Sequence, residues 1–310
     1  MTSKFSGVIP PVVVARHEDR SLDLPSYQRN LERLIGAGVH GLFILGSSGE
    51  GAFLTMKQRE AILRTTMETV DGRLPVLAGV IDTQTDRVLE MVKQAEDFGV
   101  DAIVSTAPFY ALGGMAQVER HFRVLREHTE LPIFGYDIPV CTHIKFSNQM
   151  SMRLGEEGVL NGIKDSSGDD VGFRYLCLLN REAGHPLQLF TGHEVVVDGA
   201  YMSGADGSVP GLGNVDPFTY VEQWNAFQAG DWEKVRSLQD QLADLMTITS
   251  VPYSILGMGA GVGAFKVALK LLGVFESDTI GEPVARLQPD EVESIRKILV
   301  RHGLVDETAV

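Results

Sequence analysis

The segments PIFGYDIP (residues 132–139) and NGIKDSSGD (residues 161–169) decide the fold of this chain. The first begins as a short apolar run, and the second follows Val159 and Leu160 and contains Ile163. Both then change abruptly to Tyr, Lys, Asp, Ser, Gly or Pro. Two further segments, GSSGEG (46–51) and APFY (107–110), follow apolar runs of their own. Apolar runs without alternation are typical of strands buried on both faces of a parallel sheet. These segments therefore predict parallel strands whose polar side chains gather at the strand ends.

The same rhythm, followed outward in both directions, predicts eight strands between the N-terminus and about residue 215. The predicted strands are Val8–Ala15, Gly41–Gly46, Pro75–Val80, Ala102–Ala107, Pro132–Asp137, Asn161–Lys164, Leu187–Thr191 and Gly207–Pro210. Between them, Tyr27–Ala37, Lys57–Val70 and Asp86–Phe98 place apolar residues on one helical face. Alternating strands and helices fit either a doubly wound sheet or a closed barrel. Polar residues at so many strand ends favour an α/β fold of the (β/α)₈ TIM-barrel type, because a barrel brings all eight ends to one face.

The strand rhythm stops after Asp216. Four further helices are predicted beyond that point: Pro217–Ala229, Trp232–Ser250, Gly261–Leu272 and Asp290–His302. We expect residues 1–215 to form the barrel. Residues 216–310 would then form a C-terminal helical extension that packs on the barrel as one structural unit.

Composition excludes several classes of partner. The chain has 27 basic and 41 acidic residues and a formal net charge of −14, so we expect neither a nucleic acid nor a membrane as partner. No apolar run approaches the roughly 20 residues of a membrane helix. The two cysteines, Cys141 and Cys177, predict no disulfide framework and a reducing compartment, so we expect a cytoplasmic protein.

Lys164 is the first candidate for chemistry, because it ends an apolar strand. Burial there would disfavour its ammonium form, and a neutral amine can attack a ketone to give an iminium. The alternative is a lysine that pairs with Asp165 or another carboxylate at an exposed strand end. Tyr136 ends the preceding strand, where a phenol can move protons beside a lysine-bound intermediate. It can equally close the rim of the core.

The loop Gly46–Gly51 follows the second strand. Its amides together with the hydroxyls of Ser47 and Ser48 can hold a carboxylate as an anion nest. No Lys-Ser/Thr pair follows, so the Walker pattern for phosphate fails, and the glycine spacing does not match a dinucleotide fingerprint. An ordinary strand-to-helix turn is the alternative interpretation.

Other polar residues near strand ends are weaker candidates. Each of these residues, taken alone, is typical of a turn or of a contact at the rim. Together their polar groups could hydrogen-bond a polyol. They are Tyr110, Ser166, His193, Glu194 and Ser208. No HExxH, CxxC or metal-ligand spacing of carboxylates is present, so we expect no metal.

Taken in order and spacing, these motifs resemble the dihydrodipicolinate synthase and N-acetylneuraminate lyase family of pyruvate-dependent class I aldolases. The resemblance rests on GSSGE (46–50), PFY (108–110), YDIP (136–139), GIKDSSGD (162–169), GADGSVPGLGN (204–214) and GAFK (263–266). It implies a barrel with a C-terminal helical extension, a 2-keto acid substrate, no cofactor beyond a covalent Schiff base, and a homotetramer built as a dimer of dimers.

The resemblance also implies a role for each matching residue. Lys164 matches the Schiff-base lysine and Tyr136 the proton-relay tyrosine. Ser47 and Ser48 match the hydroxyl pair that binds the keto-acid carboxylate, and Ser47 also links the two relay tyrosines. Tyr110 matches the second of these tyrosines, which reaches into the neighbouring subunit's site. Val209 matches the residue beside the pyruvyl group.

Departures from the family pattern indicate the substrate. Synthases carry an arginine two residues after the proline of the YxxP motif, and Cys141 stands there in this chain. Without a guanidinium the pocket loses its carboxylate recognition. Ser166 and Glu194 resemble the sugar-binding residues of the neuraminate lyases, with His193 where an aspartate is usual.

These departures favour aldol cleavage of a 2-keto-3-deoxy sugar acid or sialic-acid-like compound. The alternatives are dehydration of such a sugar acid, condensation of pyruvate with aspartate semialdehyde by a dihydrodipicolinate synthase, and a non-catalytic keto-acid-binding protein.

Overall fold

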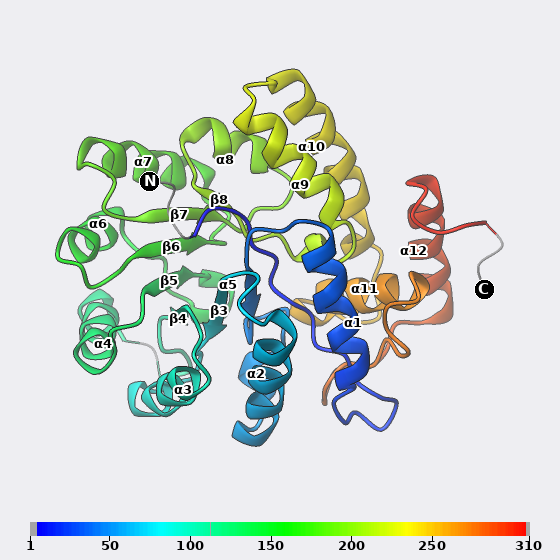
Figure 1. Cartoon of the computed structure of the whole chain (residues 1–310), viewed down its shortest axis with the longest axis horizontal. Coiled ribbons are helices and arrows are strands. Elements are labelled where there is room, and N and C mark those ends of the chain that lie inside the picture. Colours follow the sequence, from blue (N-terminus) through cyan, green and yellow to red (C-terminus); the bar gives the residue numbers. More distant parts are fainter. Residues whose placement is uncertain (1–4, 112, 308–310) are drawn as a thin grey trace.

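The computed structural model describes residues 5–111 and 113–307, and its centre is a ring of eight parallel strands (Figure 1). The strands are β1 (Gly7–Val8), β2 (Leu42–Ile44), β3 (Val76–Gly79), β4 (Ala102–Thr106), β5 (Ile133–Asp137), β6 (Gly162–Asp165), β7 (Gln188–Thr191) and β8 (Gly207–Ser208). Each strand from β2 to β7 pairs with the next strand along the chain, and β8 also pairs with β1. The sequence-based prediction of a TIM barrel is therefore confirmed.

The barrel closes between β1 and β2 through an irregular segment. Pro10 and Pro11 follow β1, and proline has no N–H to donate to a ladder. The strand predicted over Val8–Ala15 is accordingly reduced to two residues. Closure is still made by the backbone, because the Phe43 amide donates to the Pro10 carbonyl at 3.0 Å and the Val12 amide donates to the Phe43 carbonyl at 2.8 Å.

Helices surround the ring of strands (Figure 1). They are α1 (Leu24–Gly36), α2 (Met56–Val70), α3 (Thr85–Asp97), α4 (Met115–His128), α6 (Asn148–Glu156), α7 (Asp170–Glu182) and α8 (Val197–Ser203), with a short α5 (Pro139–Thr142) after β5. Apart from the short α5, these helices bury one apolar face each, as amphipathic periodicity predicts. Side-chain caps fix several starts, such as Thr55, which accepts from the Gln58 amide at the first turn of α2.

Two apolar layers result, one inside the barrel and one between strands and helices. Aromatic rings of Phe43, Phe134 and Phe190 fill much of the inside. Gly162 on β6 makes room for them, since a Cβ there would lie 2.4 Å from Cε1 of Phe134. Lys164 lies two residues further along the same face of β6, so its side chain enters the barrel above a packed aromatic floor.

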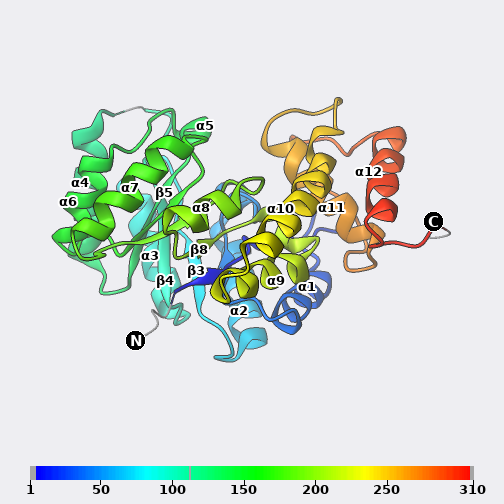
Figure 2. The same ribbon diagram turned by 90° about the horizontal axis from the view of Figure 1, so that it is seen from above.

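The C-terminal part of the chain is helical (Figures 1 and 2). It contains α9 (Pro217–Gln228), α10 (Trp232–Met246), α11 (Met258–Leu271) and α12 (Pro289–Arg301). The helix predicted over Trp232–Ser250 ends at Met246 and continues as a 3₁₀ turn over Thr247–Ser250. Among the described residues, no helix has the length and apolarity needed to cross a membrane.

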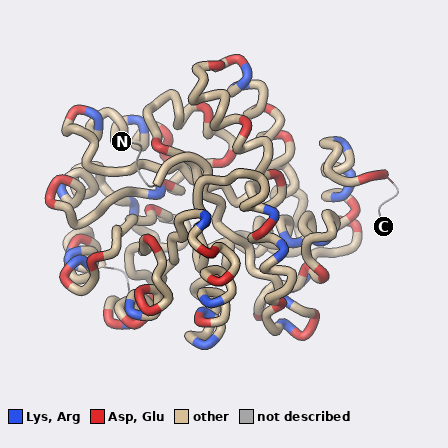
Figure 3. The backbone as a smooth tube through the Cα atoms, viewed as in Figure 1, with Lys and Arg blue, Asp and Glu red and all other residues tan. Residues whose placement is uncertain are grey.

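Charged residues lie mainly on the outer helices and loops. Figure 3 shows basic and acidic positions interspersed there, with no stripe of basic residues along one element. The acidic residues, 41 against 27 basic ones, are thus distributed along the chain and are not gathered on one element.

Candidate active site

Lys164 and Tyr136 are neighbours across two strands. They are register partners in the β5–β6 ladder, and their residues are 6% and 3% exposed. The Lys164 Nζ lies 3.9 Å from the centroid of the Tyr136 ring and 5.1 Å from that of Phe43. Among the described residues, no carboxylate forms an ion pair with this nitrogen, and Asp165 pairs with Lys145. The amine is therefore buried against aromatic faces without an ion-pair partner, unlike the exposed, paired lysine of the alternative interpretation.

The loop after β2 brings hydroxyls to the same place. The Ser47 Oγ lies 3.4 Å from the Tyr136 hydroxyl, and Ser48 is the next residue of the loop. The loop is anchored by Glu50, whose carboxylate pairs with Lys266 and accepts from Arg16 Nε at 2.8 Å.

This anchor consists of groups that are almost wholly buried. Arg16 is 4% exposed, Glu50 1% and Lys266 0%. The anchor joins the GSSGEG motif to the GAFK motif. It shows that Glu50 and Lys266 form a buried ion pair, which the motifs alone do not indicate.

Two cavities adjoin Ser47. One, of about 480 Å³, lies between the barrel mouth and the start of α11, and its polar lining includes Ser47, Ser48 and Glu194. The other, of about 150 Å³, is lined by Ser47, Phe109 and Cys141 together with apolar residues, two threonines and Glu50. Neither cavity has Arg or Lys among its described lining residues. Below Lys164 the space is only about 10 Å³, which is at the limit for one water molecule.

Glu194 supplies a carboxylate at the barrel mouth. Its Oε1 accepts from the Leu212 amide at 2.5 Å. Burial raises the pKa of this carboxyl to about 7. The hydrogen bond from the Leu212 amide and the charge of Lys164 lower the pKa but do not cancel the effect of burial. Near neutral pH it can both donate and accept a hydrogen bond.

Val209 faces the barrel interior, among the residues around the Lys164 stem, whereas the hydroxyl of Ser208 lies on the other side of the strand. The Ser208 Oγ is 3.0 Å from the hydroxyl of Tyr201 on α8. The structure therefore brings Val209, but not the Ser208 side chain, to the predicted site.

His193 also points away from the cavities. Its Nε2 accepts from the Gly168 amide at 2.6 Å, and its Nδ1 lies 2.5 Å from Asp170 Oδ1. Both ring nitrogens are thus engaged, Nε2 by the loop after β6 and Nδ1 by the first residue of α7. Ser166 begins that loop, and its Oγ lies beside Gly192, where a Cβ would approach it to 2.0 Å.

Tyr110 and Cys141 lie at the outer edge of the site. Tyr110 is 91% exposed and has a left-handed φ of 76°, which is strained for a residue with a side chain. Within this chain its hydroxyl has no hydrogen-bond partner among the described residues. Cys141 is an exposed residue with a free thiol on α5 that lines the smaller cavity.

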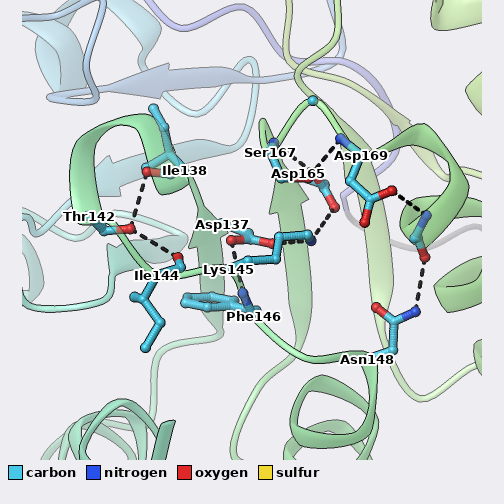
Figure 4. Close-up of polar contacts among 12 residues, drawn as sticks. Asp137, Ile138, Thr142, Ile144, Lys145, Phe146, Asn148, Asp165, Ser167 and Asp169 are labelled. Atoms are coloured by element: carbon cyan, nitrogen blue, oxygen red, sulfur yellow. Dashed lines mark hydrogen bonds and ion pairs between the residues drawn. The ribbon is translucent and has the colours of Figure 1, made fainter. Parts of the chain in front are cut away.

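Sequence reasoning missed a charged cluster on the outer side of β5 and β6. Asp137 and Asp165 follow Tyr136 and Lys164 directly, and Lys145 bridges them (Figure 4). Strand alternation was the available signal, since it places the residue after an inward side chain on the outer face.

One described group could converge on a metal ion, and it does not belong to the lysine pocket. The ligand atoms of His17, Asp23 and Glu276 lie within 4.8 Å of one another. None of these residues lines either cavity at Ser47.

Comparison with known proteins extends over nearly the whole chain. The sequence profile of the Dihydrodipicolinate synthetase family matches residues 4–302. The 4-hydroxy-tetrahydrodipicolinate synthase of Methanoculleus marisnigri is 29% identical over 301 residues, covering 96% of this chain and 100% of that protein.

Among solved structures, dihydrodipicolinate synthase from Bacteroides thetaiotaomicron has a TM-score of 0.90 at 33% identity, covering 97% of this chain and 100% of that one. YagE, a prophage protein of Escherichia coli K12 solved in complex with pyruvate, has a TM-score of 0.91 at 27% identity over the same shares of the two chains. The chain belongs to the dihydrodipicolinate synthetase family and is a pyruvate-dependent class I lyase.

Proposed function

We propose that this enzyme forms a Schiff base between Lys164 and a 2-keto acid and then breaks a carbon–carbon bond to release pyruvate. The observation that carries the proposal is the buried Lys164 amine, which is 3.9 Å from the Tyr136 ring centroid and without a carboxylate partner among the described residues. A neutral lysine amine is the nucleophile that attacks a 2-keto group to give a carbinolamine and then an iminium. No cofactor is needed, because the iminium itself withdraws electrons.

Substrate binding begins at the carboxylate. Ser47, Ser48 and neighbouring amides hold it and so place C2 against the Lys164 amine. Tyr136, which is 3.4 Å from Ser47, passes the protons that convert the carbinolamine to an iminium and water. The relay is completed by Tyr110 of a neighbouring copy.

Cleavage follows from the iminium. Tyr136 takes the proton of the C4 hydroxyl, the C3–C4 bond breaks, and the aldehyde leaves while the electron pair enters the iminium as an enamine. Protonation at C3 and hydrolysis of the imine then give pyruvate and return the Lys164 amine.

The preferred substrate is a 2-keto-3-deoxy sugar acid or a sialic-acid-like compound. The cavities offer no described cationic residue for a second carboxylate, and Cys141 occupies the position of the synthase arginine. We assign Val209 to the pyruvyl group, and Ser166 and Glu194 to the rest of the substrate. A carboxyl such as Glu194, with a pKa of about 7, can donate to or accept from sugar hydroxyls.

A dehydratase of the same family would share the Schiff base and eliminate water instead. A dihydrodipicolinate synthase remains the alternative that the names of the relatives favour. A keto-acid-binding protein would not require both Lys164 and Tyr136 in contact.

We also propose a homotetramer, a dimer of dimers. Two exposed surfaces support it. Tyr110 projects from the chain with its side chain in solvent. On α7 and α8, Val171, Tyr175 and Met202 are 69%, 60% and 62% exposed around a groove of about 640 Å³. Exposed apolar patches of this kind are typical of interfaces.

The decisive test is mass spectrometry after incubation with pyruvate and borohydride, with the adduct mapped to a peptide. An adduct on Lys164 supports the proposal and justifies a comparison of sugar acids with aspartate semialdehyde as substrates. No adduct, or one on another lysine, contradicts it and favours the binding-protein alternative.

Tyr136→Phe is expected to lower kcat by about 10²–10⁴-fold, the usual contribution of a general acid–base group. The fold should remain, because among the described residues the lost hydroxyl has a single hydrogen-bonding contact, the 3.4 Å one with the Ser47 Oγ. Pyruvate release and the thermal melt are the measurements. Tyr201→Phe is the matched control, since its hydroxyl bonds to Ser208 outside the barrel and its loss should leave kcat unchanged.

Cys141→Arg is expected to create or raise condensation of pyruvate with aspartate semialdehyde, because the guanidinium would supply the missing carboxylate contact. Sugar-acid cleavage should fall in the same variant. Product analysis by chromatography measures both reactions. Efficient condensation by the unmodified protein would exclude the sugar-acid assignment.

A further inference from the structure

Lys145 lies between two buried carboxylates where β5 and β6 end (Figure 4). Its ammonium pairs with Asp137 Oδ2 and lies 3.3 Å from Asp165 Oδ2. The other oxygens of the two carboxylates are also held, since Asp137 Oδ1 accepts from the Phe146 amide at 3.1 Å and Asp165 Oδ1 from the Ser167 amide at 2.8 Å. Both aspartates are 1% exposed, whereas the Lys145 side chain is 33% exposed, so the two carboxylates are shielded from water and the lysine is only half-buried.

The cluster occupies the register position next to the reacting pair. In the β5–β6 ladder Tyr136 is opposite Lys164, and Asp137 is opposite Asp165. Successive side chains of a strand point to opposite faces. Tyr136 and Lys164 therefore point into the barrel, while the two aspartates point outward to Lys145.

This is also the last pair of the ladder. Beyond it, the Ser166 amide donates to the Asp137 carbonyl at 2.9 Å, and the chains then separate into loops. Strand ends have fewer backbone bonds to fix them than strand centres, so an ion bridge at this point has most influence on the spacing of the two strands.

Lys145 supplies the positive charge that both aspartates of the cluster pair with. Burial raises the pKa of Asp137 to about 6, Lys145 opposes that rise, and Asp165 adds to it. For Lys145, burial lowers the pKa, but Asp165 and Asp137 raise it above its ordinary value. Without the ammonium, two carboxylates would face each other in a buried space, and repulsion or protonation would alter their positions.

We propose that Lys145 is a positioning residue for the reaction: by bridging Asp137 and Asp165 it sets the spacing of the β5 and β6 ends and so holds the Tyr136 hydroxyl at working distance from the Lys164 amine. It acts through the strands and touches no substrate. The inference rests on the proposed function, since only a Schiff-base mechanism requires this spacing.

The test begins with Lys145→Met, which keeps the length of the side chain and removes its charge. The maximal rate of borohydride-trapped adduct formation with pyruvate is expected to fall about 10–100-fold, as for a small misplacement of reacting groups. The pyruvate concentration for half-maximal rate should not change, because Ser47 and Ser48 are untouched. Lys234→Met is the control, since this lysine makes a single exposed pair with Glu222 at 2.7 Å.

A triple variant separates positioning from stability. Lys145→Met combined with Asp137→Asn and Asp165→Asn leaves no charge within the cluster, and the amide oxygens can still accept from the Phe146 and Ser167 amides. Resistance to urea is expected to recover while the trapping rate stays low.

A trapping rate that recovers together with stability would make Lys145 purely structural and the inference wrong. A wild-type trapping rate in Lys145→Met would also contradict it. Absence of a Lys164 adduct in the unmodified protein would contradict the proposed function and this inference together. The two preceding outcomes, in which the unmodified protein forms the adduct, would contradict this inference alone.

Discussion

Lys164→Ala is expected to abolish turnover, with a loss of more than about 10⁴-fold, as is usual when a covalent nucleophile is removed. No other described amine can replace it, because the Lys164 side chain is the one placed against Tyr136 inside the barrel. Lys164→Arg should be equally inactive, since a guanidinium stays protonated at neutral pH and does not form an imine with a 2-keto acid. Pyruvate release and the mass of the borohydride adduct are the measurements.

The fold of both variants should persist, because Lys164 makes no ion pair with the described residues and its removal leaves no carboxylate unpaired. Lys93→Ala is the control for loss of a lysine, since Lys93 is exposed and pairs with Asp97 at 3.6 Å. Lys93→Ala should release pyruvate at the unmodified rate and form as much borohydride-trapped adduct as the unmodified protein. Normal rates in Lys164→Ala would refute the Schiff-base mechanism outright.

The positions of Lys164 and Tyr136 illustrate what the sequence could predict. Apolar runs that end in reactive side chains indicated both the barrel and the face at which those side chains meet. Strand boundaries were less certain, and β1 is shorter than predicted because Pro10 and Pro11 cannot donate to a ladder. The two adjacent prolines are the sequence signal for this early end of the strand.

Strand alternation explains the differences at the site. Ser208 and Val209 were both assigned to the substrate, yet adjacent residues of a strand face opposite sides. The structure places Val209 inside and Ser208 against Tyr201. The same rule could have identified Asp137 and Asp165 as outward partners of an ion bridge. It could not have found Lys145, which reaches them from a loop.

Contacts between distant segments were beyond sequence reasoning. The motif GAFK was noted only through the resemblance, and its Lys266 pairs with Glu50, a residue 216 positions away. The bond of His193 to Gly168 is likewise invisible in the sequence, because it depends on how two loops approach one another.

Glu50→Gln is expected to lower the free energy of unfolding by about 3–5 kcal/mol, the range for a buried ion pair that loses one partner. Glu50 neutralises two buried cations, since its oxygens contact Lys266 and, at 2.8 Å, Arg16. Burial lowers the pKa of Lys266, and the Glu50 charge opposes that effect. Without this carboxylate, Lys266 is left with the Thr279 carbonyl as acceptor, at 2.9 Å.

The same change should weaken substrate binding, because Glu50 anchors the loop that carries Ser47 and Ser48. Urea unfolding measures the first effect and the pyruvate concentration for half-maximal adduct formation the second. Glu32→Gln is the matched control, since Glu32 pairs with Arg73 at 2.8 Å on the surface, where screening by water leaves such pairs little influence on stability. The double variant Glu50→Gln with Lys266→Met should regain part of the stability by removing one of the two unpaired cations. If Glu50→Gln unfolds at the same urea concentration as the parent, the buried pair does not anchor the loop, and the carboxylate-binding role of Ser47 and Ser48 would need another support.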